Sequence, residues 1–156
     1  MESQSCRPEF RETQRASGTL GVQLQSLEVR QPSDFDGAFQ AASREGAEAL
    51  IVLGSRLIFR NRQRVGDFAE KNKLVVVGVS SWLMDAGALL SYGPNTSDLF
   101  RRASTCIDKI LKGARPSDLP MQQPTTFELT INIKTAKKLG LALPLTLLAR
   151  VDKMID

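Results

Sequence analysis

The sequence predicts an α/β domain built around a parallel β-sheet. Two apolar runs of strand length, residues 49–53 and 74–79, have the unbroken hydrophobicity of strands that are buried on both faces. The segments before and between these runs carry the apolar repeat of amphipathic helices. The order β-α-β-α-β over residues 22–79 requires right-handed crossovers, which place the strands parallel to one another.

The first three elements are predicted as helix, strand and helix. Residues 8–17 are charged and suit a helix, and residues 22–29 alternate as a strand does. The apolar positions of residues 35–42 recur at helical spacing. Ser33 is placed to cap that helix through its side chain, and Gly46 is placed to end it.

The central elements follow the same alternation. Residues 57–72 are predicted as the helix between the two apolar strands. Residues 80–87 suit one or two helical turns, and residues 88–91 suit a short strand. Residues 97–112 form a strongly amphipathic helix, and the three prolines of residues 115–124 predict an extended crossing segment.

The C-terminal elements are predicted as a strand and two helices. Residues 127–133 alternate apolar and polar side chains, as a strand does. Asn132 is placed to cap a short helix over residues 134–139. A final helix is expected after Pro144, and its apolar face should reach Ile155.

The helix at residues 8–17 should follow a strand in a parallel sheet, yet only a short polar stretch precedes it. We therefore expect a fold that is incomplete at its N-terminus. Residues 1–7 are expected to be a polar extension, and residues 8–93 the core of one α/β lobe. Residues 94–156 should supply a crossing helix, the proline-rich segment and the closing strand and helix of the same fold.

The composition excludes several kinds of chemistry. The chain has no His and two Cys, so Ser-His-Asp and Cys-His nucleophiles, imidazole ligands and a cysteine zinc site are all ruled out. The net charge of +4 lies entirely in residues 73–156, without the dense basic stripe and interleaved aromatics of nucleic-acid-binding proteins. We expect no catalytic residues, no metal, no cofactor and no nucleic-acid partner.

Polar and aromatic side chains follow the two apolar strands. Ser55 comes after the first strand, and Ser80, Ser81 and Trp82 come after the second. In open parallel sheets ligands bind beyond the carboxyl ends of strands. Serines and free backbone N–H groups suit a carboxylate, and an indole suits an apolar or aromatic ligand. The alternative is that the serines only cap helices and that Trp82 only fills the core.

Several stretches resemble a known family when they are taken together. They are GVQLQSLEVR at 21–30, DFD at 34–36, ALIVL at 49–53, GALLSYGPN at 87–95, DLFRRA at 98–103, DKILKG at 108–113, PSDLP at 116–120 and INIKTAKKLG at 131–140. In this order and spacing they resemble the second lobe of ABC-transporter substrate-binding proteins of the tryptophan/tyrosine type. The resemblance runs from about residue 8 to the C-terminus.

The resemblance implies a periplasmic-binding-protein-like class I fold, in which two Rossmann-like, three-layer α/β/α lobes hold the ligand between them. It implies that the chain is a solute-binding component of an ABC importer, for aromatic amino acids or another small carboxylate-bearing solute, and that the intact protein works in the periplasm with an ABC permease. The implied ligand-binding positions are Ser55, Ser80, Ser81, Trp82 and, more loosely, Asp85 and Tyr92.

The chain also departs from that family. Its members are longer, with a secretion signal, an N-terminal lobe and the first strand of the second lobe, so we expect a truncated and impaired chain. The polar, acidic N-terminus is no secretory signal, which would leave the chain as written in the cytoplasm. Its exposed lobe surface favours a homo-oligomer. Some members carry Thr-Asp-Asn after the first apolar strand, where this chain has Gly54, Ser55 and Arg56, and this difference leaves the ligand open.

Two other classes of function remain as alternatives. Class I binding folds also serve as small-molecule-sensing regulatory modules of the cytoplasm, and these need an output segment. A small enzyme of flavodoxin-like shape is the second alternative, although the chain lacks His and has no clustered carboxylate pair.

Overall fold

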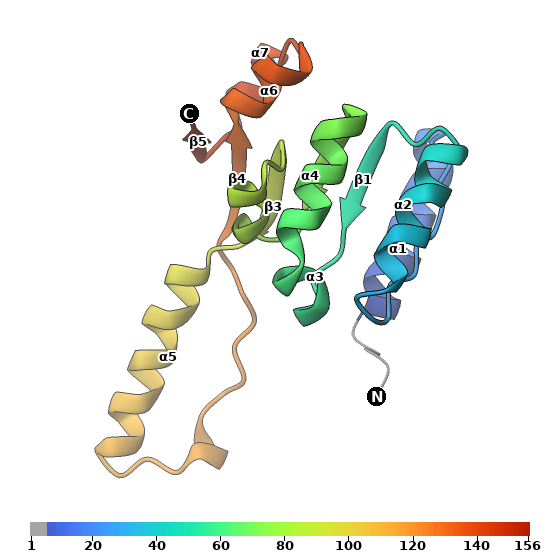
Figure 1. Ribbon diagram of the computed structural model, residues 1–156. Coiled ribbons are helices and arrows are strands. Elements are labelled where there is room, and N and C mark those ends of the chain that lie inside the picture. The colour runs from blue at the N-terminus through green and yellow to red at the C-terminus, as the bar shows by residue number, and fades with distance from the viewer. Residues whose placement is uncertain (1–5) are drawn as a thin grey trace.

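The computed structural model describes residues 6–156, and the α/β fold class is confirmed. The sheet has five strands in the order β1-β2-β3-β4-β5 (Figure 1). β1, β2 and β3 are parallel, β4 runs antiparallel to β3, and β5 is parallel to β4. The strands are β1 (Ala49–Val52), β2 (Val75–Gly78), β3 (Leu90–Pro94), β4 (Phe127–Asn132) and β5 (Lys153–Ile155).

Helices make up most of the remaining ordered chain. They are α1 (Cys6–Leu20), α2 (Asp34–Arg44), α3 (Arg56–Arg60), α4 (Arg62–Asn72), α5 (Thr96–Leu111), α6 (Ile133–Leu139) and α7 (Leu145–Leu148), with 3-10 turns η1 (Ser81–Ala86) and η2 (Pro116–Asp118). Among residues 6–156 no helix is long and apolar enough to cross a membrane.

The hydrophobic core lies where α2, α4 and η1 meet β1 and β2. Leu83 of η1 is 1% exposed and Phe35 of α2 is 2% exposed. The α4–η1 contact is especially close, because a Cβ added at Gly66 would lie 1.9 Å from the carbonyl oxygen of Ala86. Any side chain at Gly66 would therefore push α4 away from η1.

The prediction of a strand at residues 22–29 is wrong. These residues form irregular chain between α1 and α2, and Val22 is 58% exposed. The physical reason is that a strand needs a partner for its backbone groups. In the described part of the chain β1 pairs only with β2, so nothing stands beside residues 22–29 to pair with them. β1 is therefore an edge strand with Ile51 52% exposed, and the prediction that residues 49–53 are buried on both faces is also wrong.

The predicted C-terminal helix is wrong as well. Helix α7 ends at Leu148, and the last residues become strand β5. The cause is a long-range contact at Asp152, whose backbone N–H donates to the carbonyl of Leu129 at 3.0 Å. The Asp152 carboxylate in turn accepts from the backbone N–H of Leu129 at 2.8 Å. These two bonds draw the end of the chain onto β4.

The other predicted helices need smaller corrections. The helix predicted over residues 57–72 is two helices, α3 and α4, separated at Asn61. Ser33 makes no side-chain cap to α2. Instead the Asp34 carboxylate accepts from the backbone N–H of Arg30 at 2.9 Å and of Gln31 at 3.1 Å. These hydrogen bonds lower the pKa of Asp34, and the bond from Arg30 has the largest effect.

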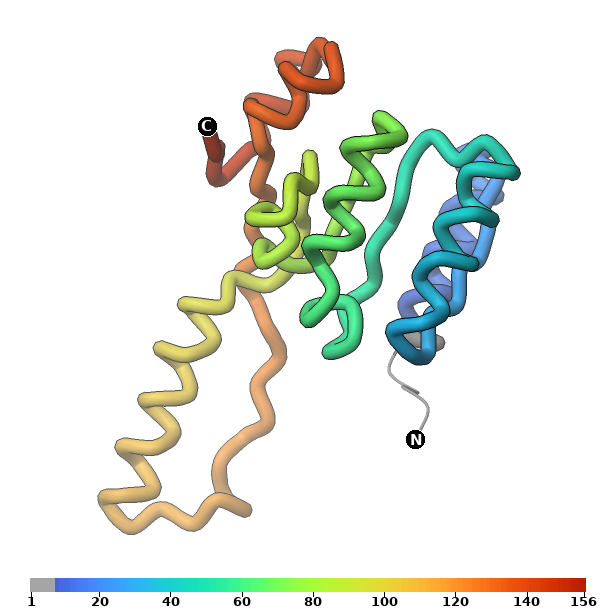
Figure 2. Tube along the Cα trace, viewed as in Figure 1, coloured from blue at the N-terminus to red at the C-terminus, as the bar shows by residue number. Residues whose placement is uncertain are grey.

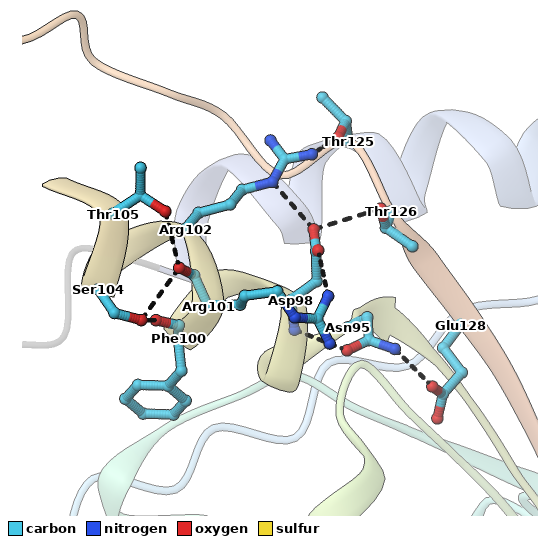
Figure 3. Close-up of polar contacts among 10 residues, drawn as sticks. All are labelled: Asn95, Asp98, Phe100, Arg101, Arg102, Ser104, Thr105, Thr125, Thr126 and Glu128. Carbon is cyan, nitrogen blue, oxygen red and sulfur yellow. Dashed lines mark hydrogen bonds and ion pairs between the residues drawn. The ribbon is translucent and has the colours of Figure 1, made fainter.

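Helix α5 and the chain that returns from it project away from the sheet (Figures 1 and 2). We call residues 96–126 the arm. No residue of α5 is buried, and Phe100 and Leu111 are 72% and 82% exposed. Polar contacts fasten the base of the arm. Asn95 N–H donates to the Thr126 carbonyl at 3.0 Å. Asp98 pairs with Arg102 at 3.0 Å (Figure 3). Arg102 also donates to the hydroxyl of Thr125.

Candidate functional site

The carboxyl ends of β1, β2 and β3 lie on one edge of the sheet, because these strands are parallel neighbours. The chain segments that follow them approach one another closely. A Cβ added at Gly93 of β3 would lie 2.0 Å from the carbonyl oxygen of Val79, just after β2. Two hollows open along this edge. This is where open parallel sheets place ligands.

The first hollow, which we call the apolar hollow, has a volume of about 370 Å³. Its aromatic wall is formed by Trp82 and Phe59, whose rings meet edge to face with centroids 5.3 Å apart. The guanidinium of Arg62 lies over the Phe59 ring, 4.9 Å from its centroid. The lining residues are Gly54, Ser55, Arg56, Phe59 and Trp82.

Ser55 and Trp82 are the two predicted residues that the structure brings to the apolar hollow. The Ser55 hydroxyl accepts from the backbone N–H of Ile58 at 3.1 Å, so it caps α3 as the alternative reading proposed. That bond uses the oxygen as an acceptor and leaves the hydroxyl proton to donate elsewhere. Trp82 is half-buried and packs against the core. Both side chains still line the apolar hollow while they fill these structural roles.

The second hollow, which we call the polar hollow, has a volume of about 150 Å³ and lies between β3, β4, β5 and the N-terminus of α5. Ser80 and Ser81 are the predicted residues that border it. They directly precede Trp82 in the chain, so residues 80–82 contribute to both hollows. The remaining lining residues are Ser91, Gly93, Pro94, Asn95, Thr96, Ser97, Glu128, Thr130 and Lys153.

Asp85 and Tyr92 border neither of these hollows. Asp85 is exposed on η1. Tyr92 alternates with Ser91 and Gly93 along β3 and therefore faces the other side of the sheet. There it is 57% exposed and stacks on Phe127 with ring centroids 5.7 Å apart.

Sequence reasoning missed Phe59, Arg56 and most of the polar hollow. Phe59 stands four residues after Ser55, a spacing that places both on one side of a helical turn, so this signal was present in the sequence. The side chains from β4 and β5 had no such local signal, since their position depends on strand register. Among residues 6–156 no cluster of His, Cys, Asp and Glu is arranged to hold a metal ion.

Solved structures with a similar fold were found by comparison. A conserved domain protein from Vibrio cholerae O1 biovar El Tor matches with a TM-score of 0.83 and 22% identity, over 94% of this chain and 49% of its own. The ABC domain from Streptococcus pneumoniae, in complex with L-Trp, matches with a TM-score of 0.85 and 21% identity, over 96% of this chain and 50% of its own. At this level of sequence identity, both matches show a similar fold.

A third similar structure is the ligand-free, open form of a substrate-binding protein with adhesive properties from Clostridium difficile. Its TM-score is 0.70 at 18% identity, over 99% of this chain and 52% of its own. This chain thus spans about half the length of the structures that it matches. The fold is that of one part of a periplasmic-binding-protein-like molecule.

The sequence comparison is consistent with the fold. No curated protein matches the chain. The family model described as ABC transporter substrate binding protein matches residues 2–155, which is nearly the whole chain. The chain therefore belongs to the family of ABC transporter substrate-binding proteins.

Proposed function

We propose that this chain recognises solute for an ABC importer, and that the solute is a small carboxylate-bearing molecule, with aromatic amino acids as the first candidates. The observation that carries the proposal is the aromatic wall of Trp82 and Phe59 in a hollow at the carboxyl edge of the sheet. Membership of a substrate-binding family and a structural neighbour in complex with L-Trp support it.

The apolar hollow suits an aromatic side chain in size and chemistry. Its volume of about 370 Å³ is open to solvent on one side, so the hollow offers a surface against which an aromatic ring can lie. A ligand ring can add to the edge-to-face pair of Trp82 and Phe59, because aromatic rings favour offset or edge-to-face contact. The Ser55 hydroxyl and the exposed Arg56 provide polar partners at the rim.

The hollow is one wall of a binding site rather than an enclosed cavity. The similar structures are about twice as long as this chain, and in the proposed mechanism the other wall comes from a second lobe. Each tenfold loss of affinity corresponds to about 1.4 kcal/mol. Losing several contacts from one wall therefore turns micromolar binding into millimolar binding, so this chain alone should be impaired.

The proposed partners and location follow from the same assignment. A complete protein of this kind would work outside the cytoplasmic membrane and deliver its solute to an ABC permease. It would perform no covalent chemistry, because recognition and release are sufficient for that task. The exposed apolar side chains of the arm would favour self-association of this chain when no second lobe covers them.

The test is a titration of the 15N-labelled chain with L-tryptophan, followed through the indole N–H of Trp82 and the backbone N–H of Ser55. We expect saturable chemical-shift changes at both positions, with a dissociation constant in the millimolar range. Trp82→Ala and Ser55→Ala should weaken binding at least several-fold, and Ser104→Ala on α5 should not. An unchanged affinity in Trp82→Ala would refute the proposal.

A further inference from the structure

The segment that contains α6 and α7 combines positive charge with leucine. We call residues 133–150 the tip. The tip has four basic residues, no Asp and no Glu, so its charge of +4 equals the net charge of the whole chain. It also has six leucines. The basic residues are Lys134, Lys137, Lys138 and Arg150.

The tip lies at the end of the sheet that is opposite the two hollows. Strand β4 is antiparallel to β3, so its carboxyl end lies beside the amino end of β3. The backbone N–H of Asn132, just before α6, donates to the carbonyl of Leu89 at 2.9 Å. Figure 1 shows α6 and α7 at this end of the sheet, while α5 leaves from the other end. No residue of the tip lines either hollow.

Three ammonium groups share one side of α6. Lys137 and Lys138 follow Lys134 at three and four residues, a spacing that places side chains on the same face of a helix. All three are exposed, and Ala136 is buried on the packed side. Lys138 pairs with Glu70 of α4 at 2.7 Å. Lys134 and Lys137 form no ion pair with another described residue, so their charges are available to a partner.

The tip also holds apolar side chains out into solvent. Leu145, at the start of α7, is 82% exposed, and Leu141, in the loop before it, is 41% exposed. The backbone around them is hydrogen-bonded: Leu141 N–H donates to the Ala136 carbonyl at 3.0 Å, and Leu148 N–H donates to the Pro144 carbonyl at 3.1 Å. The two leucines therefore project from a fixed backbone rather than from an open loop.

The combination selects one kind of partner. Exposed leucines flanked by Lys and Arg are typical of segments that lie on a membrane surface, where the apolar side chains enter the acyl boundary. The long stems of Lys and Arg pack along apolar surface while their charges reach the head groups. Anionic lipids supply the complementary negative charge. A soluble acidic surface would satisfy the lysines and leave Leu145 in water.

We propose that the tip docks on the surface of an anionic lipid bilayer. Leu145 and Leu141 would enter the boundary between head groups and acyl chains. Lys134, Lys137 and Arg150 would contact the head-group phosphates. Because the hollows lie at the other end of the sheet, this docking leaves them uncovered, and the inference does not depend on the proposed function.

The test is flotation of the full chain with lipid vesicles through a density gradient, which separates bound chain from self-associated chain. One set of vesicles contains phosphatidylglycerol and phosphatidylcholine in equal parts, and the other contains phosphatidylcholine alone. We expect the chain to float with the mixed vesicles at low salt, and much less at high salt, because salt screens the attraction. Absence of flotation with the mixed vesicles would overturn the proposal, and so would equal flotation with the two sets.

Variants test the leucine and the charges separately. Leu145→Ser should weaken binding to the mixed vesicles about tenfold, through the loss of buried apolar surface. Lys134→Gln and Lys137→Gln should each weaken it about fivefold. The matched control is Leu111→Ser on α5, because Leu111 is also 82% exposed and lies beside a lysine, Lys112. It should leave binding unchanged, and an effect equal to that of Leu145→Ser would refute docking through the tip.

The lysine variants keep the proposal testable if Leu145→Ser disturbs α7, which circular dichroism would reveal. Both lysines are exposed, so their replacement should leave the fold intact. Soluble polyglutamate presents negative charge without an apolar layer. We expect the chain to bind it much more weakly than the mixed vesicles. Binding of equal strength, with no effect of Leu145→Ser, would indicate an acidic protein surface as the partner and would overturn the assignment to a bilayer.

Discussion

Helices α4 and α5 are both amphipathic, yet the structure treats them in opposite ways. Helix α4 buries Val65 and Ala69 against the sheet and η1. Helix α5 has the more strongly apolar face, and none of its residues is buried. An apolar stripe therefore shows that a helix has a face to cover, but it does not show which surface covers it. In this chain the lobe around β1 and β2 is packed, and the arm is unpartnered.

The largest expected difference in stability is between substitution of a core leucine and substitution of a leucine in the arm. Leu83→Ala should destabilise the chain by about 2–5 kcal/mol, because Leu83 is 1% exposed and its loss leaves a cavity. Leu111→Ala, at a position that is 82% exposed, should change stability by less than about 0.5 kcal/mol. Urea unfolding followed by circular dichroism measures both. Similar costs for the two variants would show that the arm is packed in solution.

A second comparison uses glycines of the packed and open regions. Gly93→Ala would place a Cβ 2.0 Å from a backbone oxygen, and the resulting overpacking should cost about 1–3 kcal/mol. Gly18→Ala, in helix α1 with no atom within 4 Å of the added Cβ, should stabilise by up to about 1 kcal/mol. Thermal melts of the two variants should therefore shift in opposite directions. A Gly93→Ala variant as stable as the wild-type chain would mean that β3 lies further from Val79 than the structure places it.

A third comparison asks whether the arm finds a partner in a second copy. Ile107→Lys places a charge on the exposed apolar face of α5, where Ile107 is 56% exposed. We expect it to weaken self-association at least tenfold, or by about 1.4 kcal/mol, in sedimentation equilibrium. Thr105→Lys adds the same charge on another side of the same helix and should have little effect. A wild-type chain that sediments as a monomer at every concentration would rule out association through the arm.

The smallest expected effect is a pH dependence at the start of α2. The pKa of Asp34 is lowered from its ordinary value of 3.8, first by the hydrogen bond from Arg30. A lowered pKa in the folded state means that the carboxylate stabilises the fold above the unfolded-state pKa, and that this contribution is lost as pH falls through the folded-state pKa. Asp34→Asn should remove that part of the acid dependence, measured as urea midpoints between neutral pH and pH 3. If the urea midpoints of the wild-type and Asp34→Asn chains change with pH in parallel, this prediction is contradicted.

Local patterns predicted the elements whose shape depends on their own residues. Strand β2 was predicted from one apolar run, and α6 from its cap, where the Asn132 side chain accepts from Thr135 N–H at 2.9 Å. Residues 22–29 were mispredicted because a strand also needs a neighbour. The C-terminal residues were mispredicted because the bonds between Asp152 and Leu129 join positions far apart in the sequence.

The same division applies to the candidate site. The direction of the parallel strands was enough to predict that Ser55 and Trp82 approach the same edge. Ser91, Thr130 and Lys153 form a row across the sheet at the polar hollow, and this row depends on the register of three strands. A one-residue slip in any of these pairings would turn a polar side chain to the other face, so no local pattern in the sequence could have predicted the row.

The close approach of the two ends of the arm has a topological consequence. Pro94 and Phe127 are paired across the antiparallel strands β3 and β4, and the Asn95–Thr126 hydrogen bond lies just beyond them. These strands therefore form a β-hairpin in which a long insertion replaces the turn. A two-residue turn such as Asn-Gly would join them equally well, so the order of strands in the sheet does not depend on the insertion. The length and sequence of the insertion are therefore separable from the aromatic wall at Trp82, because no residue of the arm lines that hollow.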